Sequence, residues 1–66
     1  MTVVKVIELI CEGNSIQAAI ESAVVEAAKT LNNIRQVNVD HIEALVENNK
    51  IKAYRLIVKI SFVVER

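Results

Sequence analysis

The C-terminal third of the chain carries apolar residues on both faces of a predicted β-strand. Side chains alternate between the two faces of a strand, and residues 54–64 alternate cleanly, with Leu56, Val58 and Ile60 on one face. The opposite face still includes Ile57 and Val63. Residues 3–11 are also β-branched and apolar on both faces, which predicts a strand covered on both sides. A single helix covers only one face of such a sheet, so the other face requires another molecule.

The small size of the chain leads to the same expectation. Its 66 residues form one domain, 1–66, and such a domain buries only about 60% of the surface of its unfolded chain. Cys11 is the only cysteine and His41 the only histidine, which excludes an intrachain disulfide and makes a four-ligand zinc site improbable. Because 53% of the residues are nonetheless hydrophobic, some apolar side chains must lie at the surface, where they typically mark an interface. We therefore expect a homo-oligomer.

One helix is predicted after the first strand. Ser15 or Asn14 can cap its start by accepting a backbone N–H, and Asn32-Asn33 is expected to end it, since Asn tolerates the left-handed conformation. An apolar stripe recurs at helical spacing along this segment and consists of Ile16, Ala19, Ile20, Ala23, Val24, Ala27 and Leu31. Val25 lies almost opposite this stripe and is expected to be exposed.

Residues 34–47 predict a second strand in which the apolar residues change from odd-numbered to even-numbered positions. Val37 and Val39 are odd-numbered, whereas Ile42 and Val46 are even. One face of a strand cannot switch parity without an extra residue, so we expect a β-bulge near Asp40-His41. A tight turn at residues 47–50 then leads into the third strand. The fold class is α+β: a β-α-β-β unit whose three-stranded antiparallel sheet packs on one helix.

Charge and hydropathy exclude several classes of partner. The net charge is zero, with eight basic and eight acidic residues, whereas a nucleic-acid partner requires a basic surface. No apolar run approaches the ~20 residues of a transmembrane helix. Lys5 and Glu8 interrupt the N-terminal apolar stretch, which argues against a signal peptide. With a lone thiol, these features predict a cytoplasmic protein without membrane or nucleic-acid partners.

A few residues are candidates for chemistry. The best candidates for metal ligands are Asp40, Glu43 and Glu47, because calcium binds six to eight oxygens, mostly from carboxylates and carbonyls. Three acids on one strand cannot enclose an ion alone, so such a site would need symmetry-related copies. Solvated surface acids are the alternative. His41 is expected at the bulge as an exposed polar residue, and Cys11 as a small buried hydrophobe. No residues have nucleophilic or acid–base spacing, so the chain is not expected to be an enzyme.

Several segments in this order and spacing resemble the dodecin family over nearly all 66 residues. They are residues 5–9 (KVIEL), 28–35 (AKTLNNIR), 47–51 (ENNKI) and 59–62 (KISF). The resemblance implies a hollow homododecamer that binds a small molecule for storage or protection. Many dodecins bind flavins such as riboflavin or FMN, with a tryptophan stacking on the isoalloxazine ring and a glutamine hydrogen-bonded to it.

Gln36 and Arg55 occupy the positions that match this tryptophan and glutamine. Gln36 offers less contact area than an aromatic ring, and Arg55 lacks the acceptor of an amide. Flavin binding is therefore expected to be weak, and the chain resembles more closely the dodecins that lack the tryptophan and are associated with calcium. Two alternatives remain open: Gln36 and Arg55 are polar groups of an interface, with Arg55 in an ion pair, or the assembly is a purely structural shell.

Overall fold

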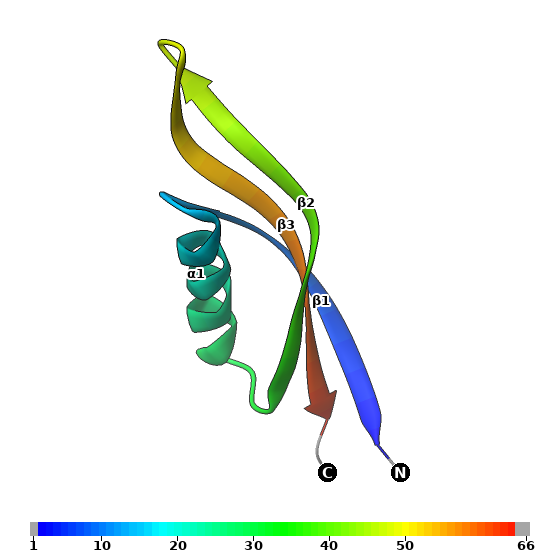
Figure 1. The fold of residues 1–66 in the computed structure, drawn as a ribbon. Coiled ribbons are helices and arrows are strands. Elements are labelled where there is room, and N and C mark those ends of the chain that lie inside the picture. Colours follow the sequence, from blue (N-terminus) through cyan, green and yellow to red (C-terminus); the bar gives the residue numbers. More distant parts are fainter. Residues whose placement is uncertain (1, 65–66) are drawn as a thin grey trace.

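The computed structural model describes residues 2–64, which form one helix and three strands in the predicted β-α-β-β order (Figure 1). The elements are β1 (Val3–Gly13), α1 (Ile16–Ala28), β2 (Ile34–Glu47) and β3 (Lys50–Val64). The bounds of β2 are those expected from the sequence, and β1 is two residues longer than predicted.

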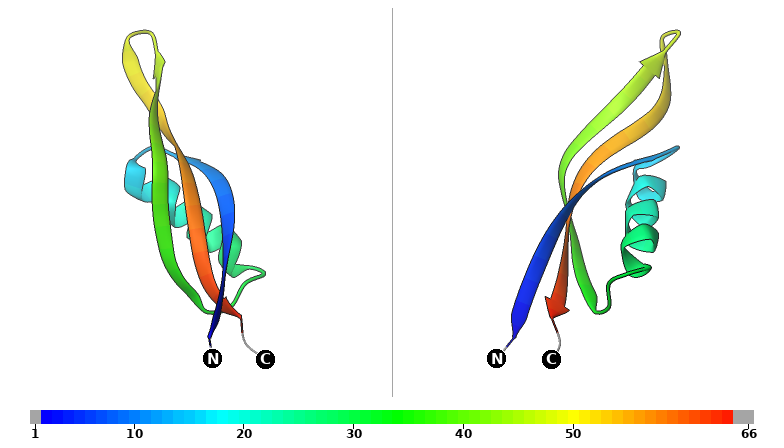
Figure 2. Two further views of the ribbon diagram at one scale, coloured as in Figure 1. Left: turned by 90° about the vertical axis from the view of Figure 1, so that its right-hand side faces the viewer. Right: turned by 180° about the vertical axis from the view of Figure 1, so that it is seen from behind.

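The three strands form one antiparallel sheet in the order β1-β3-β2. The C-terminal strand is therefore central, and α1 lies against one face only, as Figure 2 shows from two further sides. This is the two-layer arrangement expected of a sheet with a single amphipathic helix. We call the face that α1 covers the inner face, and the opposite one the outer face.

The core lies between the middle of β3 and the helix. Leu56, Val58 and Ile60 are fully buried on β3, and the helix packs Ala19, Ala23 and Ala27 against the sheet. Alanine side chains allow the helix to approach the sheet closely. At the start of the helix the approach is closer still, because a Cβ atom on Gly13 would lie 2.5 Å from the backbone nitrogen of Ala19.

The predicted start of the helix is confirmed, but its predicted end is wrong. Ser15 accepts a hydrogen bond from the backbone nitrogen of Ala18 at 3.0 Å. The helix ends at Ala28 with Lys29 as its C-cap, rather than at Asn32-Asn33. The left-handed residue is Asn33, with φ of 60°, and it lies in the connection to β2. The predicted stripe included Leu31 because this apolar residue falls at helical spacing. Leu31 does pack on the core, but it does so from the connection that follows the helix.

The predicted bulge is confirmed on β2. Val39 pairs with Val58 and His41 with Ile57, which leaves Asp40 as the extra residue. Two further irregularities in the β2–β3 ladder, between Ile34 and Gln36 and between Leu45 and Val46, were not predicted. The turn is also as expected, since Asn48 and Asn49 have φ of 54° and 61°.

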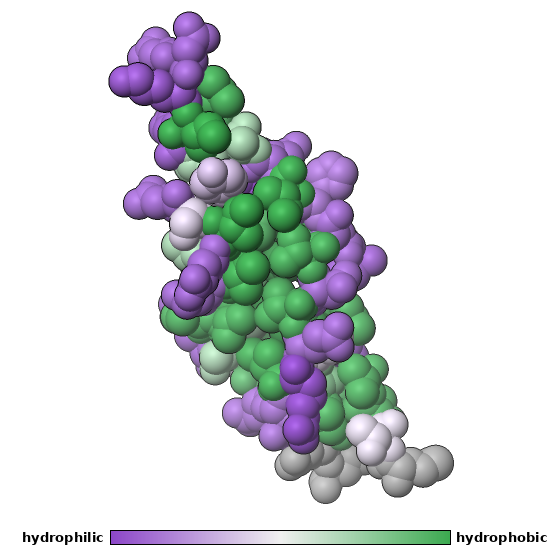
Figure 3. Space-filling view, in the orientation of Figure 1, coloured by the Kyte–Doolittle hydropathy of each residue, from purple (hydrophilic) through white to green (hydrophobic). Residues whose placement is uncertain are grey.

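The subunit is elongated rather than spherical. It measures 51 × 20 × 13 Å, and its radius of gyration is 13.7 Å, against about 11 Å for a compact chain of this length. Among residues 2–64, nine large hydrophobic side chains are exposed, Val25 among them as predicted. Ile57 and Val63 lie on the outer face as predicted, but are partly buried by their neighbours. Figure 3 shows hydrophobic side chains over much of one side of the molecule.

Candidate functional site

The outer face of the sheet carries most of the candidate residues. Reading across the three strands, polar rows alternate with an apolar row. In each row the residue of the central strand β3 pairs with one residue on β1 and one on β2. The rows, written in the order β1-β3-β2, are Glu8-Lys59-Asn38, Ile10-Ile57-His41 and Glu12-Arg55-Glu43. With Asp40 beside Lys59, the two polar rows contain four carboxylates and two basic groups. These rows are therefore acidic although the whole chain is neutral.

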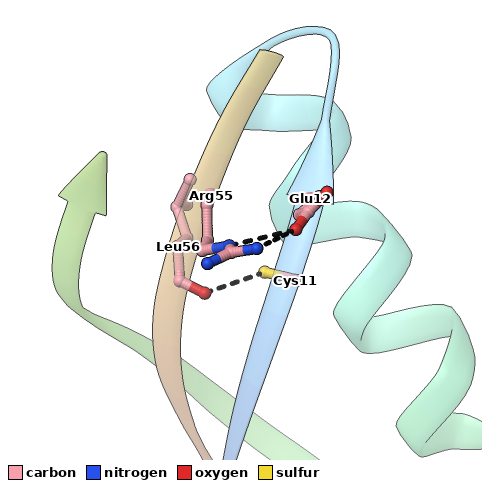
Figure 4. Close-up of polar contacts among 4 residues, drawn as sticks. All are labelled: Cys11, Glu12, Arg55 and Leu56. Carbon is pink, nitrogen blue, oxygen red and sulfur yellow. Dashed lines mark hydrogen bonds and ion pairs between the residues drawn. The ribbon is translucent and has the colours of Figure 1, made fainter. Parts of the chain in front are cut away.

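Arg55 is held by an acid from the neighbouring strand (Figure 4). Its Nε donates a hydrogen bond to Oε2 of Glu12 at 3.0 Å, and its Nη2 lies 2.9 Å from the same oxygen. The two residues are directly opposite in the register of β1 and β3. Both side chains are about half exposed, so the pair contributes only about 0–1 kcal/mol to stability. Its main effect is to fix the direction of the guanidinium group, which agrees with the ion-pair interpretation of Arg55.

Gln36 lies on the same outer face but far from Arg55. It is exposed and pairs with Ser61, six residues along β3 from Arg55. At about 3.3 Å per residue the two positions are about 20 Å apart along the strand. One subunit does not bring Gln36 and Arg55 together, so any pocket that uses both must take them from different subunits.

No aromatic side chain lies near either of these positions on the outer face. The sequence contains two aromatic residues, Tyr54 and Phe62. Both have the same parity on β3 as the buried Leu56, Val58 and Ile60, so they belong to the inner face. Both are partly buried, and Tyr54 packs on the core. The outer face of one subunit therefore offers a flat ring no aromatic surface for stacking.

The three predicted metal ligands are dispersed along β2. Asp40 lies 3.2 Å from Nζ of Lys59, Glu47 lies 3.1 Å from Nζ of Lys52, and Glu43 is opposite Arg55 in the ladder. Asp40 also accepts a hydrogen bond from Nδ2 of Asn38 at 2.7 Å. Among residues 2–64 no three acidic, histidine or cysteine side chains form a group that could hold a metal ion.

His41 and Cys11 have the predicted environments. His41 is an exposed residue beside the bulge, opposite Ile57. Cys11 is buried under the helix, and its Sγ donates a hydrogen bond of 3.7 Å to the carbonyl oxygen of Leu56 (Figure 4). Burial raises the pKa of the Cys11 thiol above its ordinary value, which makes the thiolate less accessible.

A hollow at the other end of the sheet was not anticipated from the sequence. It has a volume of 770 Å³ and opens between residues 30–33, which follow α1, and the paired ends of β1 and β3. Lys5 and Phe62, which are opposite each other in the ladder, both line it. A signal was present in the sequence, because Lys5 has the same parity as the inward-facing Ile7 and Leu9. A charged residue in an inward-facing position often marks an open region of the core.

Comparison with known proteins identifies the family. A family model named Dodecin matches residues 3–65, nearly the whole chain. The chain belongs to the dodecin family. The β-α-β-β subunit found here is the dodecin fold, and the expected homododecamer fits this family. Dodecins are known for binding flavins and for storage rather than catalysis.

Solved structures agree with this assignment. A point mutant of Thermus thermophilus dodecin superimposes with a TM-score of 0.93 at 27% sequence identity, over the full length of both chains. Dodecin from Streptomyces coelicolor gives a TM-score of 0.90 at 20% identity, covering 98% of this chain and 94% of that one. Dodecin from Streptomyces davaonensis gives 0.89 at 17% identity, covering 98% and 97%. The two Streptomyces structures support the fold alone.

A search among curated sequences and a search for membrane-spanning helices both gave negative results. No curated protein sequence matches the chain. Within the part of the chain that the structure describes, no helix has the length and apolarity needed to cross a membrane.

Proposed function

We propose that this chain is the subunit of a non-enzymatic homododecameric shell that binds a small ligand for storage, and that it binds flavins far more weakly than dodecins with an aromatic residue at the position of Gln36. The observation that carries the proposal is the absence of an aromatic side chain from the described outer face. Gln36 and Arg55 lie on that face, whereas Tyr54 and Phe62 are on the inner one.

The neighbours of Arg55 further disfavour the usual flavin contact. Two of its nitrogens are engaged by Oε2 of Glu12. A guanidinium group has no acceptor, so it cannot reproduce the hydrogen bond that an amide oxygen accepts from a flavin ring. A ligand that contacts Arg55 must compete with the carboxylate of Glu12 and also lies close to Glu43, which is opposite on β2. Anionic flavins such as FMN are therefore disfavoured here more than neutral riboflavin.

The loss of affinity is large. An aromatic contact contributes about 0.5–1.5 kcal/mol beyond the area that it buries, and the smaller side chain of Gln36 also loses part of that area. A loss of about 2.8 kcal/mol corresponds to about 100-fold in affinity, because each 1.4 kcal/mol is a factor of ten. We expect riboflavin to bind at least about 100-fold more weakly than to a dodecin with the tryptophan.

The described residues offer little for catalysis. Cys11 is buried with a raised pKa, and the Oγ of Ser15 accepts a hydrogen bond as a helix cap. Neither has a neighbouring base that would activate it as a nucleophile. These environments, together with the storage role of the family, support a binding protein rather than an enzyme.

A calcium-binding role is the second candidate, and it depends on the acids of the outer face. Asp40 and Glu47 each have a lysine partner within about 3.2 Å, so an ion would have to displace these ammonium groups. Calcium also needs six to eight oxygens, more than one subunit brings together. The excess of carboxylates in the rows around Lys59 and Arg55 favours cations in general, but a specific site requires carboxylates from several copies.

The test is riboflavin fluorescence quenching by the native protein and by the double variant Gln36→Trp with Arg55→Gln. The matched controls are Gln36→Leu with Arg55→Gln, which supplies apolar area without a ring, and Arg55→Gln alone. We expect weak quenching by the native protein and both controls, and tight quenching by the tryptophan variant. Tight quenching by the native protein would refute the proposed weak binding and restore ordinary flavin storage.

A second titration separates the remaining roles. If none of the proteins quenches riboflavin, calorimetry with Ca²⁺ on the native assembly and on Asp40→Asn tests the cation role. Heat of binding that disappears in Asp40→Asn would favour the calcium alternative. No heat from either protein would leave the purely structural shell.

A further inference from the structure

Arg55 lies between two carboxylates on the outer face of the sheet. In the ladder it is directly opposite Glu12 on β1 and Glu43 on β2, and neighbouring strands are only about 5 Å apart. Its guanidinium group is turned toward Glu12, since Nε and Nη2 both contact the Oε2 atom of Glu12 (Figure 4). Among residues 2–64, Glu43 has no ion pair. The row therefore combines one fixed cation with two carboxylates, of which one has no basic partner.

The side chains on both sides of this row are apolar. The next outer-face pairs along the ladder are Ile10 with Ile57 in one direction and Leu45 with Ala53 in the other. Ile10 is 67% exposed, so it is available for contact with a ligand. A flat ring that packs on these side chains has its polar edge near the row of Arg55. The charges of that row then decide which rings are accepted.

The contact with Glu12 limits what Arg55 can offer to a ligand. Arginine typically binds a phosphate or carboxylate through two parallel N–H groups, and here Nε and Nη2 are already engaged by one carboxylate oxygen. The flat face of a guanidinium group remains able to stack on an aromatic ring. Arg55 is therefore better suited to stacking than to binding an anion, and Glu43 on the other side repels an anion further.

We propose that Glu12 is a specificity-determining residue of the ligand site. By holding Arg55 in an ion pair, and together with Glu43, it makes the site accept flat uncharged heteroaromatic rings and reject rings that carry a phosphate. A protein can discriminate by repelling the unwanted ligand as well as by attracting the wanted one, and a phosphate monoester carries about 1.5–2 negative charges near neutral pH. This inference rests on the proposed function, because it takes Arg55 as part of the ligand site.

The ion pair contributes little to folding, so its effect on ligands can be tested separately. Both side chains are about half exposed, and exposed ion pairs stabilise a fold only slightly. Removal of the Glu12 carboxylate also leaves Arg55 another carboxylate, that of Glu43, at the equivalent position on its other side. We therefore expect Glu12→Gln to fold, with a row in which one cation faces one carboxylate.

The experiment compares FMN with riboflavin, which differ only by the phosphate. Fluorescence quenching of both flavins is measured with Gln36→Trp, in which the added ring is expected to make binding measurable, and with Gln36→Trp that also carries Glu12→Gln. We expect Glu12→Gln to raise the affinity for FMN relative to riboflavin at least about tenfold, because a charge close to a phosphate interacts strongly at the effective dielectric constant of a protein surface.

The matched control is Glu8→Gln in the same Gln36→Trp protein. It removes one carboxylate from the same face of β1, four residues before Glu12, which is about 13 Å away along the strand. That distance exceeds the Debye length of about 10 Å at 0.1 M salt. Glu8→Gln should leave the ratio of the two affinities unchanged, and an equal rise in both variants would assign the effect to overall charge and overturn the role of Glu12.

Ionic strength gives a second measurement that needs no variant of Glu12. Salt screens charge repulsion, with a Debye length of about 10 Å at 0.1 M and about 3 Å at 1 M. With Glu12 intact, the affinity of Gln36→Trp for FMN relative to riboflavin should rise at least about threefold over this range. An unchanged or falling ratio would show that the row does not repel the phosphate. This measurement decides the question even if Glu12→Gln does not fold.

The remaining outcomes separate this inference from the proposed function. If Glu12→Gln changes the affinities for FMN and riboflavin by the same factor, Glu12 supports the structure only and the inference is wrong. If Gln36→Trp binds neither flavin, with or without Glu12, Arg55 is not part of a ligand site and the inference fails, whereas weak flavin binding by the native protein stands. Tight binding of riboflavin by the native protein refutes the proposed weak binding, but the ratio of FMN to riboflavin affinity still tests Glu12.

Discussion

Deletion of Asp40 should prevent the sheet from forming in its native register. Asp40 is the extra residue of the bulge, with Val39 opposite Val58 and His41 opposite Ile57. Without it the ladder becomes continuous, and residues on one side of the deletion must turn to the other face. The Asn48-Asn49 turn holds the C-terminal part of β2 in place, so the residues preceding the deletion are the ones that turn outward.

The cost of this inversion can be estimated from three side chains. Ile34, Val37 and Val39 lie on the inner face, packed against the buried core and partly buried. Full burial of such a side chain contributes about 1.5–3 kcal/mol. At about half that value each, the three together contribute about 2–5 kcal/mol. A chain of this length has a stability of only about 3–10 kcal/mol, so the deletion removes a large share of it.

The matched control is Asp40→Ala, which keeps the residue count and removes only the side chain. It loses the 3.2 Å ion pair with Lys59 and the hydrogen bond from Asn38. The ion pair is at the surface, where such pairs contribute about 0–1 kcal/mol. The control therefore separates the role of the extra backbone residue from that of the carboxylate.

Urea unfolding followed by circular dichroism, at one fixed protein concentration, measures both variants. A fixed concentration is needed because assembly stabilises the folded subunit by mass action. We expect the deletion variant to be unfolded or to lose at least about 2 kcal/mol, and the control to unfold near the native midpoint. A deletion variant with the native spectrum, unfolding midpoint and oligomer size would show that the bulge is not needed for the register.

Two further predictions concern the end of β1. Gly13→Ala should destabilise the fold by about 1–3 kcal/mol, as overpacking does, because its Cβ would lie 2.5 Å from the backbone nitrogen of Ala19. Thermal unfolding measures this, and an unchanged midpoint would contradict the close approach. For Cys11 the folded-state pKa is raised above its ordinary value of 9.0, so the folded state retains the proton longer than the unfolded state and stability should fall as pH rises above about 9. Cys11→Ala should show a smaller fall in urea-unfolding stability between pH 8 and pH 10, and equal falls in the two proteins would refute this role of the thiol.

Much of the local structure was predictable because it depends on neighbouring residues. Ser15 caps the helix through a hydrogen bond three residues away, and the two asparagines of the turn adopt left-handed φ values with little strain. The bulge was predictable from the parity change between Val39 and Ile42 alone. Each of these signals lies within a few residues of the structure that it specifies.

The end of the helix and the grouping of the candidate site residues could not be predicted in the same way. They depend on distances between residues far apart in the chain, which the sequence does not give. Leu31 follows the helical spacing but packs on the core from outside the helix, so periodicity extended the predicted helix too far. Gln36 and Arg55 were considered together because of the resemblance, yet the ladder places them about 20 Å apart on one face. Whether they meet across a subunit boundary remains a prediction, as does a shared site for Asp40, Glu43 and Glu47.

The sequence by itself determined that the subunit has more apolar surface than one helix can cover. Composition gives the number of apolar side chains, and strand alternation gives the face that each occupies, without any knowledge of the tertiary structure. Only the tertiary structure decided where that surplus is exposed. The ends of β1 and the start of α1 set how far the core extends, and the β2–β3 hairpin is longer than both. Val46 and Ile51 are exposed because β1 and α1 stop short of them, and Ile42 is exposed because it lies on the edge strand β2, which packs less on the helix than β1 and β3 do. Both depend on how segments far apart in the chain are placed in space.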